Sequence, residues 1–365
     1  MSAAQATYVL TAGGTGGHLF PAQALAEALS RRGHRIVLMT DQRGAAYGDR
    51  FPGADVLIVP SASPSGGIIR KAGAALKLMR GALMARRSLK RIRPAAVIGF
   101  GGYASFPALW AAARRRLPMI LHEQNAHLGR ANRMFAGKAS ALALSFEQTR
   151  ALAEGISSDV TGNPVRDAIL AIRTRAYEGP GHDGPIRLLV FGGSLGASIF
   201  AQVVPAAVAA LPSRIRDRVR VTQQVREAEL DTVRAAYAEA GIEAELASFF
   251  DNMDELLAEA HLVLARAGAS TCAELTVAGR PSVLVPYPHA ADDHQTANAK
   301  ALTDAGAAWL VPNAKFDAAA CTRTLEALLE DPEALKRMAR AAHGMARPDA
   351  AESLADLAER AGGGA

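Results

Sequence analysis

The sequence contains few cysteines and no long apolar run. Cys272 and Cys321 are the only two thiols among 365 residues, which fits a reducing compartment and argues against a disulfide framework or a cysteine zinc site. No stretch approaches the roughly 18 uninterrupted apolar residues of a membrane-spanning helix. Residues 1–11 lack the basic and apolar regions of a signal peptide. We therefore expect a cytoplasmic protein.

Acidic residues are absent from a long part of the N-terminal half. Twelve Lys and Arg, but no Asp or Glu, lie between Asp55 and Glu123. Residues 1–165 carry 21 basic and 8 acidic side chains, whereas residues 166–365 carry 20 and 27, although the net charge is only +6. This distribution predicts an anionic partner, either a nucleic acid or a membrane surface. Because the sequence has no helix-turn-helix, zinc or aromatic-rich RNA-binding signature, we expect no nucleic acid.

Strand-like and helix-like runs alternate along both halves of the chain. This order is typical of doubly wound α/β domains with parallel sheets, which bind ligands at the carboxyl ends of their strands. A chain of 365 residues, half of them hydrophobic, is long enough for two such domains. We place the domains at 1–163 and 164–345, and expect a C-terminal helix in 346–365 that packs back on the first domain. The last expected elements of the second domain are a strand at 282–286 and helices at 293–305 and 317–342.

Two glycine-rich loops lie about half a chain apart, each between a strand-like and a helix-like run. They are Gly-Gly-Thr-Gly-Gly-His at 13–18 and Gly-Gly-Ser-Leu-Gly at 192–196. Glycine lets the backbone approach a ligand closely, and the helix that follows offers unpaired N–H groups and a positive dipole end. The pair predicts two phosphate-binding-type domains that face each other across a cleft. The first loop matches neither the dinucleotide nor the Lys-Ser/Thr phosphate pattern, although Asp41 after the next strand keeps a dinucleotide interpretation open.

His18 begins the helix after the first loop, where we expect it to point into the cleft. Histidine side chains in general can exchange a proton near neutral pH, so His18 suits a general base, unless it only bonds nearby backbone at the helix start. A third glycine cluster, 99–103, and the polar run His-Glu-Gln-Asn, 122–125, follow two further strands. Four consecutive hydrogen-bonding side chains at a strand end suit sugar hydroxyls; an ordinary polar turn is the alternative.

A turn of small residues at 265–271 leads into a helix that carries Glu274. The exposed N-terminus of this helix suits a diphosphate. A carboxylate one turn inside can accept two hydrogen bonds from a ribose diol, although an acid near a helix start also complements the dipole. The loop after the next strand, 286–298, contains histidines and aspartates, but we expect no bound metal.

Seven ordered motifs across nearly the whole chain carry a resemblance to a known family. They are Gly-Gly-Thr-Gly-Gly-His (13–18) with Pro21, Gly-Phe-Gly-Gly-Tyr (99–103) with Phe106 and Pro107, His-Glu-Gln-Asn (122–125), Gly-Asn-Pro-Val-Arg (162–166), Gly-Gly-Ser-Leu-Gly (192–196), Arg266-x-Gly268 with Glu274, and Asp293-x-Gln295-x-x-Asn298. With them the chain resembles the MurG family, the peptidoglycan N-acetylglucosaminyltransferases that convert lipid I to lipid II. The resemblance implies a GT-B fold, inverting transfer of GlcNAc from UDP-GlcNAc to the C4 hydroxyl of the MurNAc of lipid I, and neither a cofactor nor a catalytic metal.

The resemblance also implies roles for individual residues. His18 would be the catalytic base. UDP-GlcNAc would bind Thr15, Gly16, Gly17, Asn125, Arg166, Ser194, Phe250, Gly268, Ala269, Ser270, Glu274 and Gln295, and the acceptor would bind Gly13, Gly14, Gly101, Gly102 and Tyr103. Glu274 would hold the ribose hydroxyls, the backbone of Phe250 would lie beside uracil, and the 268–271 turn would hold the diphosphate. His294 departs from the glutamine that the family often has at this position.

The acid-free stretch contains an amphipathic helical pattern. Its apolar residues are Ile69, Ala72, Leu76, Met79 and Leu83, and its basic residues include Arg70, Lys71, Lys77 and Arg80. A cationic helix with an apolar stripe suits an enzyme that lies on anionic lipid, where each basic residue contributes ~1 kcal/mol. A core helix with a solvated basic face is the alternative. We expect peripheral attachment to the cytoplasmic side of the inner membrane, with cell-wall synthesis and division proteins as possible partners.

Other functions are compatible with parts of the sequence. Another UDP-sugar enzyme of the same fold, such as a UDP-GlcNAc 2-epimerase or a different lipid glycosyltransferase, is the nearest alternative. An epimerase needs neither a lipid nor a basic apolar helix. A nicotinamide-dependent oxidoreductase would bind NAD(P), and a non-enzymatic nucleic-acid binder would be retained on DNA with a steep salt dependence.

Overall fold

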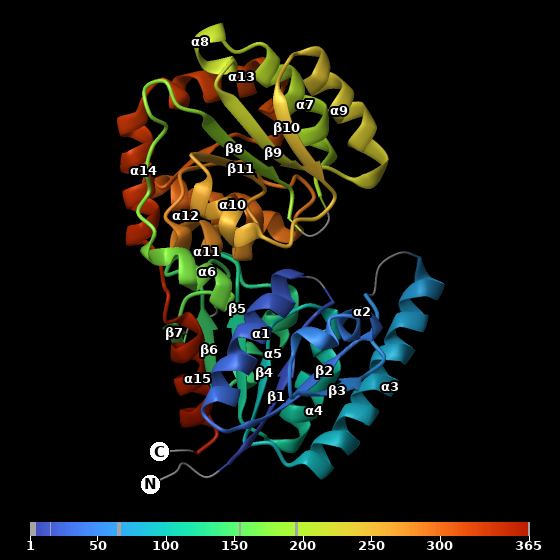
Figure 1. Ribbon diagram of the computed structural model, residues 1–365. Helices are drawn as coiled ribbons and strands as arrows, with labels where there is room; N and C mark the ends of the chain where they lie inside the picture. Colours follow the sequence, from blue (N-terminus) through green and yellow to red (C-terminus); the bar gives the residue numbers. More distant parts are fainter. Residues whose placement is uncertain (1–4, 15, 64–66, 153–154, 194–195, 364–365) are drawn as a thin grey trace. The chain divides into compact units, whose positions relative to one another are not determined.

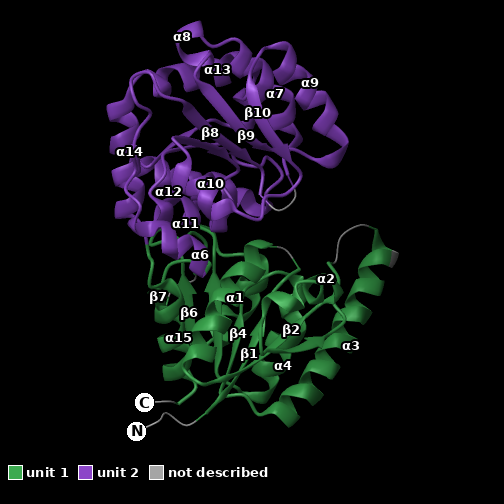
Figure 2. Cartoon of the chain, in the orientation of Figure 1, with its two compact units in different colours: residues 1–166, 347–365 green, residues 167–346 purple. Residues whose placement is uncertain are grey.

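The computed structural model describes residues 5–14, 16–63, 67–152, 155–193 and 196–363 (Figure 1). Thr15 and Ser194, both expected to bind the donor, lie outside these residues. The chain forms two compact units, unit 1 from Met1–Arg166 and Arg347–Ala365 and unit 2 from Asp167–Ala346 (Figure 2). The chain therefore changes unit between Arg166 and Asp167, close to the expected boundary.

Unit 1 contains a seven-stranded sheet in which every neighbouring pair of strands is parallel. The strands are β1 (Thr7–Thr11), β2 (Arg35–Thr40), β3 (Asp55–Ile58), β4 (Ala96–Gly99), β5 (Met119–Glu123), β6 (Ala141–Leu144) and β7 (Ser158–Val160). Their order across the sheet is β3-β2-β1-β4-β5-β6-β7. This is the strand order of doubly wound nucleotide-binding sheets, in which the winding direction reverses between the first and fourth strands.

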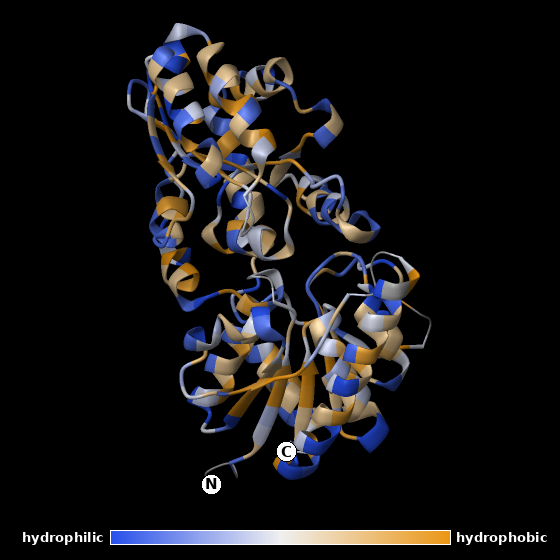
Figure 3. Cartoon of the chain, turned by 90° about the vertical axis from the view of Figure 1, so that its right-hand side faces the viewer, coloured by the Kyte–Doolittle hydropathy of each residue, from blue (hydrophilic) through white to orange (hydrophobic). Residues whose placement is uncertain are grey.

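Helices cover both faces of this sheet, and hydrophobic colouring dominates its strands in Figure 3. Successive strand residues point to opposite faces, and a buried apolar core lies on each face. Tyr8 and Leu10 lie in a core shared with α1 and α15, whereas Val9 lies in a second core with α3 and α4. The helices of unit 1 are α1 (Gly16–Arg31), α2 (Gln42–Ala45), α3 (Ile68–Ile92), α4 (Phe106–Arg115), α5 (Arg130–Phe135) and α15 (Ala350–Ala361), with 3-10 turns η1 (Gly48–Arg50), η2 (Tyr103–Ser105) and η3 (Ala136–Lys138).

Unit 2 has the same architecture, with six parallel strands in the order β10-β9-β8-β11-β12-β13. The strands are β8 (Ile186–Phe191), β9 (Val219–Gln224), β10 (Glu243–Ala247), β11 (Leu262–Ala265), β12 (Ser282–Leu284) and β13 (Ala308–Leu310). The α-helices are α6 (Asp167–Ala171), α7 (Ser198–Ala209), α8 (Ser213–Arg216), α9 (Leu230–Glu239), α10 (Met253–Glu259), α11 (Ala269–Ala278), α12 (His294–Asp304), α13 (Ala318–Leu329) and α14 (Pro332–Gly344), and the 3-10 turns are η4 (Ile172–Thr174), η5 (Glu227–Glu229), η6 (Ala291–Asp293) and η7 (Asn313–Lys315).

Two elements of unit 2 differ from expectation. Strand β13 was not expected; it is three residues long and adds to the edge of the sheet beside β12. The single helix expected at 317–342 is two helices, α13 and α14. The chain starts a new helix because the Asp331 carboxylate accepts a hydrogen bond from the Ala334 N–H and Pro332 occupies the first turn.

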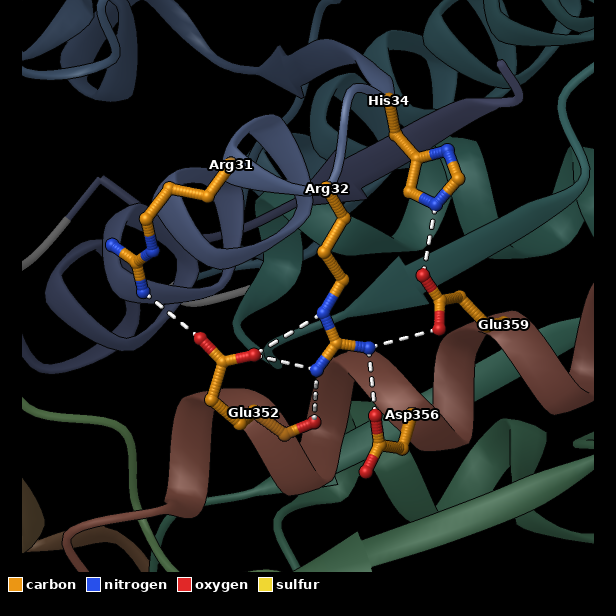
Figure 4. A network of polar contacts seen from close by, with 6 residues as sticks. All are labelled: Arg31, Arg32, His34, Glu352, Asp356 and Glu359. Atoms are coloured by element: carbon orange, nitrogen blue, oxygen red, sulfur yellow. Dashed lines mark hydrogen bonds and ion pairs between the residues drawn. The ribbon is translucent and has the colours of Figure 1, made fainter. Parts of the chain in front are cut away.

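The C-terminal helix α15 belongs to unit 1 and packs against α1. Leu354 and Leu357 are buried in the core on that face of the sheet. Figure 4 shows a polar contact beside this core, in which Arg31, Arg32 and His34 face Glu352, Asp356 and Glu359. Arg32 Nη1 donates to Asp356 at 2.7 Å and to Glu359 at 2.8 Å. Hydrogen bonding from Arg32 holds the pKa of Glu352 below its usual range. Apolar packing and ion pairs therefore both attach the C-terminal segment to unit 1.

Helix α3 exposes an apolar stripe. Leu76, Met79 and Leu83 are 72%, 55% and 46% exposed. The helix packs on α4 through another side, where Ala82 and Leu89 are buried. The exposed stripe therefore contradicts the alternative in which these apolar residues form core. The side chain of Ile69 lies outside the described part, within which no helix is long and apolar enough to cross a membrane.

The two cysteines of unit 2 are free and buried. Burial raises the pKa of the Cys272 thiol to about 12 and that of the Cys321 thiol to about 12. Both are therefore protonated near pH 7 and pack as small apolar side chains.

Candidate active site

In each unit two loops follow the neighbouring strands between which the strand order reverses. The loops of unit 1 follow β1 and β4, which pair in parallel, and those of unit 2 follow β8 and β11, which pair in the same way. Ligands of doubly wound sheets bind at this point, outside the carboxyl ends of the strands. Each unit therefore has a candidate ligand site of its own.

Glycines of unit 1 enclose the ring of His18, which is half-buried in the first turn of α1. A Cβ atom on Gly13 would lie 3.1 Å from His18 Cδ2, and one on Gly102 would lie 3.2 Å from the Cα of Gly13. Gly101 and Gly102 have φ angles of 83° and 75°, which other residues rarely adopt. These glycines therefore leave room for the imidazole and let the two loops approach each other.

The other glycines of the first loop have different surroundings. A Cβ on Gly14 would lie 2.9 Å from the backbone N of Gly44 in α2, and one on Gly16 would lie 3.1 Å from Phe20 Cε2. Around Gly17, which is exposed, no described atom lies within 4 Å of such a Cβ. Among the described glycines of this loop, Gly17 is therefore the one with the most open space beside its backbone.

A chain of hydrogen bonds extends from His18 into the protein. His18 Nδ1 lies 3.2 Å from Gln124 Oε1, and Gln124 Nε2 lies 2.9 Å from His122 Nδ1. His122 Nε2 lies 3.0 Å from the carbonyl oxygen of Gly162. Burial lowers the pKa of His122 to about 4, so its ring is neutral near pH 7. The Nδ1 side of the His18 ring is therefore held by a buried hydrogen-bond network.

The polar run at 122–125 differs from the expected row of sugar-binding groups. Glu123 is 2% exposed, and its carboxylate accepts hydrogen bonds from the backbone N–H groups of Asn125 and Gly129 at 3.0 and 2.8 Å. The side-chain amide of Asn132 donates to the same carboxylate at 2.9 Å. With His122 and Gln124 also buried, Asn125 is the half-buried member of the four. The first three side chains therefore build the loop that presents Asn125.

In unit 2, Gly192 turns the chain sharply after β8. A Cβ on Gly192 would lie 2.4 Å from the backbone N of Ala197, so the turn requires glycine. The N–H of Gly192 donates to Gln224 Oε1 at 3.1 Å, which fixes the loop against the end of β9. The loop is therefore built into the sheet edge at the point where the strand order reverses.

Helix α11 begins at the carboxyl end of β11 with Gly268 as its N-cap residue, and no described side chain caps it. The first N–H groups of such a helix favour an anion. Within the part of the chain that the structure describes, the buried hydroxyl oxygen of Ser270 has no hydrogen-bond partner. Glu274 lies one turn further along the helix and is 7% exposed. These features suit a negatively charged ligand with hydroxyl groups.

Two buried side chains hold the turn before α11. Arg266 Nη1 donates to two carbonyl oxygens after β12, at 3.0 and 2.9 Å, and to Asn313 Oδ1 at 2.8 Å. Asn298 Nδ2 donates to the carbonyl of Ala267 at 3.0 Å. The sequence motifs contained Arg266 and Asn298, but the sequence did not predict that their hydrogen bonds hold this turn in place.

The comparison with known proteins decides the family. Residues 8–144 match the N-terminal domain of glycosyltransferase family 28, and residues 187–354 match the C-terminal domain of the same family. The chain is 52% identical to the UDP-N-acetylglucosamine–N-acetylmuramyl-(pentapeptide) pyrophosphoryl-undecaprenol N-acetylglucosamine transferase of Rhodospirillum centenum, over 98% of this chain and 95% of that protein. The chain belongs to glycosyltransferase family 28. The transferase of the same name from Paramagnetospirillum magneticum is 51% identical, over 98% of this chain and 97% of that protein.

Solved structures agree with this membership. A crystal structure of MurG from Acinetobacter baumannii superposes with a TM-score of 0.79 at 29% identity, and the match covers 97% of this chain and 99% of that one. The resemblance to the MurG family and the GT-B fold are thus confirmed, and the chain is an N-acetylglucosaminyltransferase of this family. A candidate UDP-N-acetylglucosamine 2-epimerase from Listeria monocytogenes has a TM-score of 0.68 at 18% identity, which shows the shared fold alone.

Three further residues expected at the donor site of this family 28 protein lie in different parts of the chain. Phe250, in unit 2, is 8% exposed and precedes α10. Gln295, at the start of α12, accepts a hydrogen bond at Oε1 from the backbone N–H of Tyr287 at 2.8 Å, which closes the loop after β12. Arg166 is half-buried at the end of the first segment of unit 1, with its guanidinium 4.9 Å from the ring centroid of Phe20. Their part in donor binding stays a prediction.

A cavity of about 470 Å³ lies in unit 1 beside Tyr103. Its lining consists of Tyr103, Phe106, Arg130, Ala131, Arg133 and Met134. The lining therefore combines an apolar surface with two guanidinium groups, a combination suited to an anionic and partly apolar molecule.

Proposed function

We propose that the chain transfers GlcNAc from UDP-GlcNAc to the C4 hydroxyl of the MurNAc of lipid I, with inversion at the anomeric carbon, and so forms lipid II. The observation that carries this proposal is the 52% identity, over nearly the full length of both chains, to a transferase named for this donor and acceptor. The two glycine-lined strand ends offer one phosphate-binding region for each substrate.

In this reaction His18 is the general base. Nε2 of His18 takes the proton of the C4 hydroxyl while its oxygen attacks C1 of GlcNAc. The bond between C1 and the diphosphate oxygen breaks, and UDP leaves with the bonding electrons. Support comes from the glycine cradle around the His18 ring and from the buried hydrogen bonds behind it. The N-terminus of α11 suits the charge that develops on the diphosphate.

A turnover assay tests the proposed substrates. We expect the purified chain to release UDP from UDP-GlcNAc when a lipid I analogue is present, and to use UDP-GalNAc poorly. Without acceptor, no UDP should be released. UDP release without acceptor, together with formation of the 2-epimer, would support a sugar-nucleotide epimerase instead.

We further propose that α3 binds the anionic cytoplasmic surface of the inner membrane. Support comes from its exposed apolar stripe at Leu76, Met79 and Leu83 and from the exposed basic residues that flank it, Arg70, Lys71, Lys77 and Arg80. An amphipathic cationic helix of this kind lies in the interface of an anionic bilayer. The cavity beside Tyr103 would then hold part of the anionic lipid acceptor.

The triple substitution L76S, M79S and L83S should weaken binding to vesicles that contain phosphatidylglycerol by about 10²-fold, because each apolar side chain contributes roughly 1 kcal/mol or more. Co-sedimentation measures the partition coefficient, and turnover of a short-chain acceptor analogue should not change. Trp309→Ser is a matched control, because Trp309 is 53% exposed but lies in unit 2. Wild-type partitioning of the triple variant would contradict the assignment.

A further inference from the structure

We infer that Gln124 and His122 are positioning residues that hold the proton of neutral His18 on Nδ1, so that Nε2 is the nitrogen able to accept a proton. This inference rests on the proposed role of His18 as the base. Gln124 and His122 act through His18 and not through a contact with substrate. All four groups of the network lie in unit 1.

The direction of the hydrogen bonds is fixed at the buried end. A carbonyl oxygen can only accept, so the carbonyl of Gly162 requires His122 Nε2 to donate. His122 is 0% exposed and neutral, and a neutral imidazole carries one proton. His122 Nδ1 is therefore an acceptor.

This acceptor sets the orientation of the Gln124 amide. The NH₂ group of Gln124 must face His122 Nδ1, and it also lies 3.2 Å from the carbonyl oxygen of His122. The amide oxygen then faces His18. If the amide were reversed, its oxygen would meet the lone pair of His122 Nδ1, and Gln124, at 2% exposure, is out of contact with bulk solvent.

The last bond assigns the tautomer of His18. Gln124 Oε1 can only accept, so His18 Nδ1 must donate across the 3.2 Å contact. Neutral His18 therefore carries its proton on Nδ1 and its lone pair on Nε2. In a serine protease, a carboxylate fixes the tautomer and the orientation of the catalytic histidine. The network fixes both for His18 with neutral groups, so it adds no charge.

The backbone supports the far end of the network. Gly162 has φ of 86°, its N–H donates to the carbonyl of Leu144 at 3.1 Å, and a Cβ there would lie 2.5 Å from the Cβ of Arg347. Its carbonyl also accepts from Thr161 Oγ1 at 3.2 Å. The carbonyl group of Gly162, the acceptor at the buried end of the network, is thus held in one orientation.

The tautomer is measured directly by NMR of protein labelled with ¹⁵N-histidine. Long-range proton–nitrogen correlations distinguish a ring with Nδ1–H from one with Nε2–H, and the signals of His18 are those lost in His18→Gln. We expect Nδ1–H for His18 and Nε2–H for His122 in the wild type at pH 8. Nε2–H on wild-type His18 would overturn the inference whatever the activity of any variant.

Gln124→Met removes the amide at similar length. We expect mixed tautomers of His18 and a fall in kcat of about 10- to 100-fold with KM for UDP-GlcNAc within about twofold, as loss of a correctly protonated base requires. Gln23→Met, which removes an amide from the same unit where it bonds Glu27, is the matched control and should behave as wild type. If Gln124→Met folds and keeps both the tautomer and kcat, the inference fails.

The same measurements separate this inference from the proposed function. If wild-type His18 carries Nδ1–H but His18→Gln turns over normally, His18 is not the base. The network would then still determine the tautomer of His18. Where Gln124→Met does not fold, the wild-type spectrum alone decides.

Discussion

Replacing His18 with glutamine should lower kcat by about 10²- to 10⁴-fold, the usual contribution of a general base, while the dissociation constant of UDP-GlcNAc stays nearly constant. Glutamine fits the cradle of Gly13, Gly101 and Gly102, and its amide can still donate to Gln124 Oε1. It has no basic nitrogen, so the C4 hydroxyl keeps its proton. Turnover with a lipid I analogue and calorimetric titration of UDP-GlcNAc measure the two quantities.

The control for this substitution is His127→Gln in the same unit. His127 is half-buried like His18, but its backbone pairs with Arg150 and it is not part of the network. We expect wild-type turnover for it. Near-normal turnover of His18→Gln would show that His18 is not the base. An equal loss of donor affinity and turnover would instead indicate that His18 binds the donor.

The parallel sheets and the glycine loops at the strand ends could be predicted, because each depends on a short-range sequence pattern. Alternating runs indicated parallel sheets, and glycines after strands indicated tight turns at the carboxyl ends. The short edge strand β13 escaped notice because three residues carry no periodic signal. The break between α13 and α14 had a signal, since Asp331 before Pro332 is a typical helix start.

The interior of the candidate site depends on contacts between distant segments. His18 meets Gln124 across 106 residues, and Gly102 meets Gly13 from another strand end. One part of this arrangement was available from the sequence, because alternate residues of a strand share a face. The alternation of β5 places His122 and Glu123 on opposite faces, and the side chains that follow the strand divide in the same way: the Gln124 amide contacts His122, and the Asn125 amide contacts Glu123.

The attachment of α15 shows the same limit. A helix near the C-terminus was expected, and its Leu354 and Leu357 are buried in unit 1. Its packing on the first domain was expected, but its ion-pair partners could not be read from the sequence, because Arg32 and Glu352 are 320 residues apart. Charge complementarity between two such segments identifies a pair only after the sheet has brought them together.

Two explanations account for a carboxylate at position 274, and the binding of a donor analogue distinguishes them. In the first, its carboxylate accepts hydrogen bonds from both ribose hydroxyls of UDP-GlcNAc. In the second, it complements the dipole of α11. The dipole effect fades beyond the first turn, and Glu274 lies one turn inside the helix and is 7% exposed. This distance from the first turn favours the first explanation.

Glu274→Ala should therefore raise the dissociation constant of UDP-GlcNAc by about 10²-fold, or ~3 kcal/mol, the value of two hydrogen bonds to a charged group. The wild type should bind the 2′-deoxyuridine analogue more weakly than UDP-GlcNAc, whereas Glu274→Ala should bind the two nearly equally, because the group that discriminates them is gone. Glu255→Ala, which removes an exposed carboxylate from α10 of the same unit, is the control and should keep wild-type affinity and discrimination. If Glu274→Ala still discriminates the two donors as the wild type does, the ribose contact is elsewhere and the dipole explanation holds.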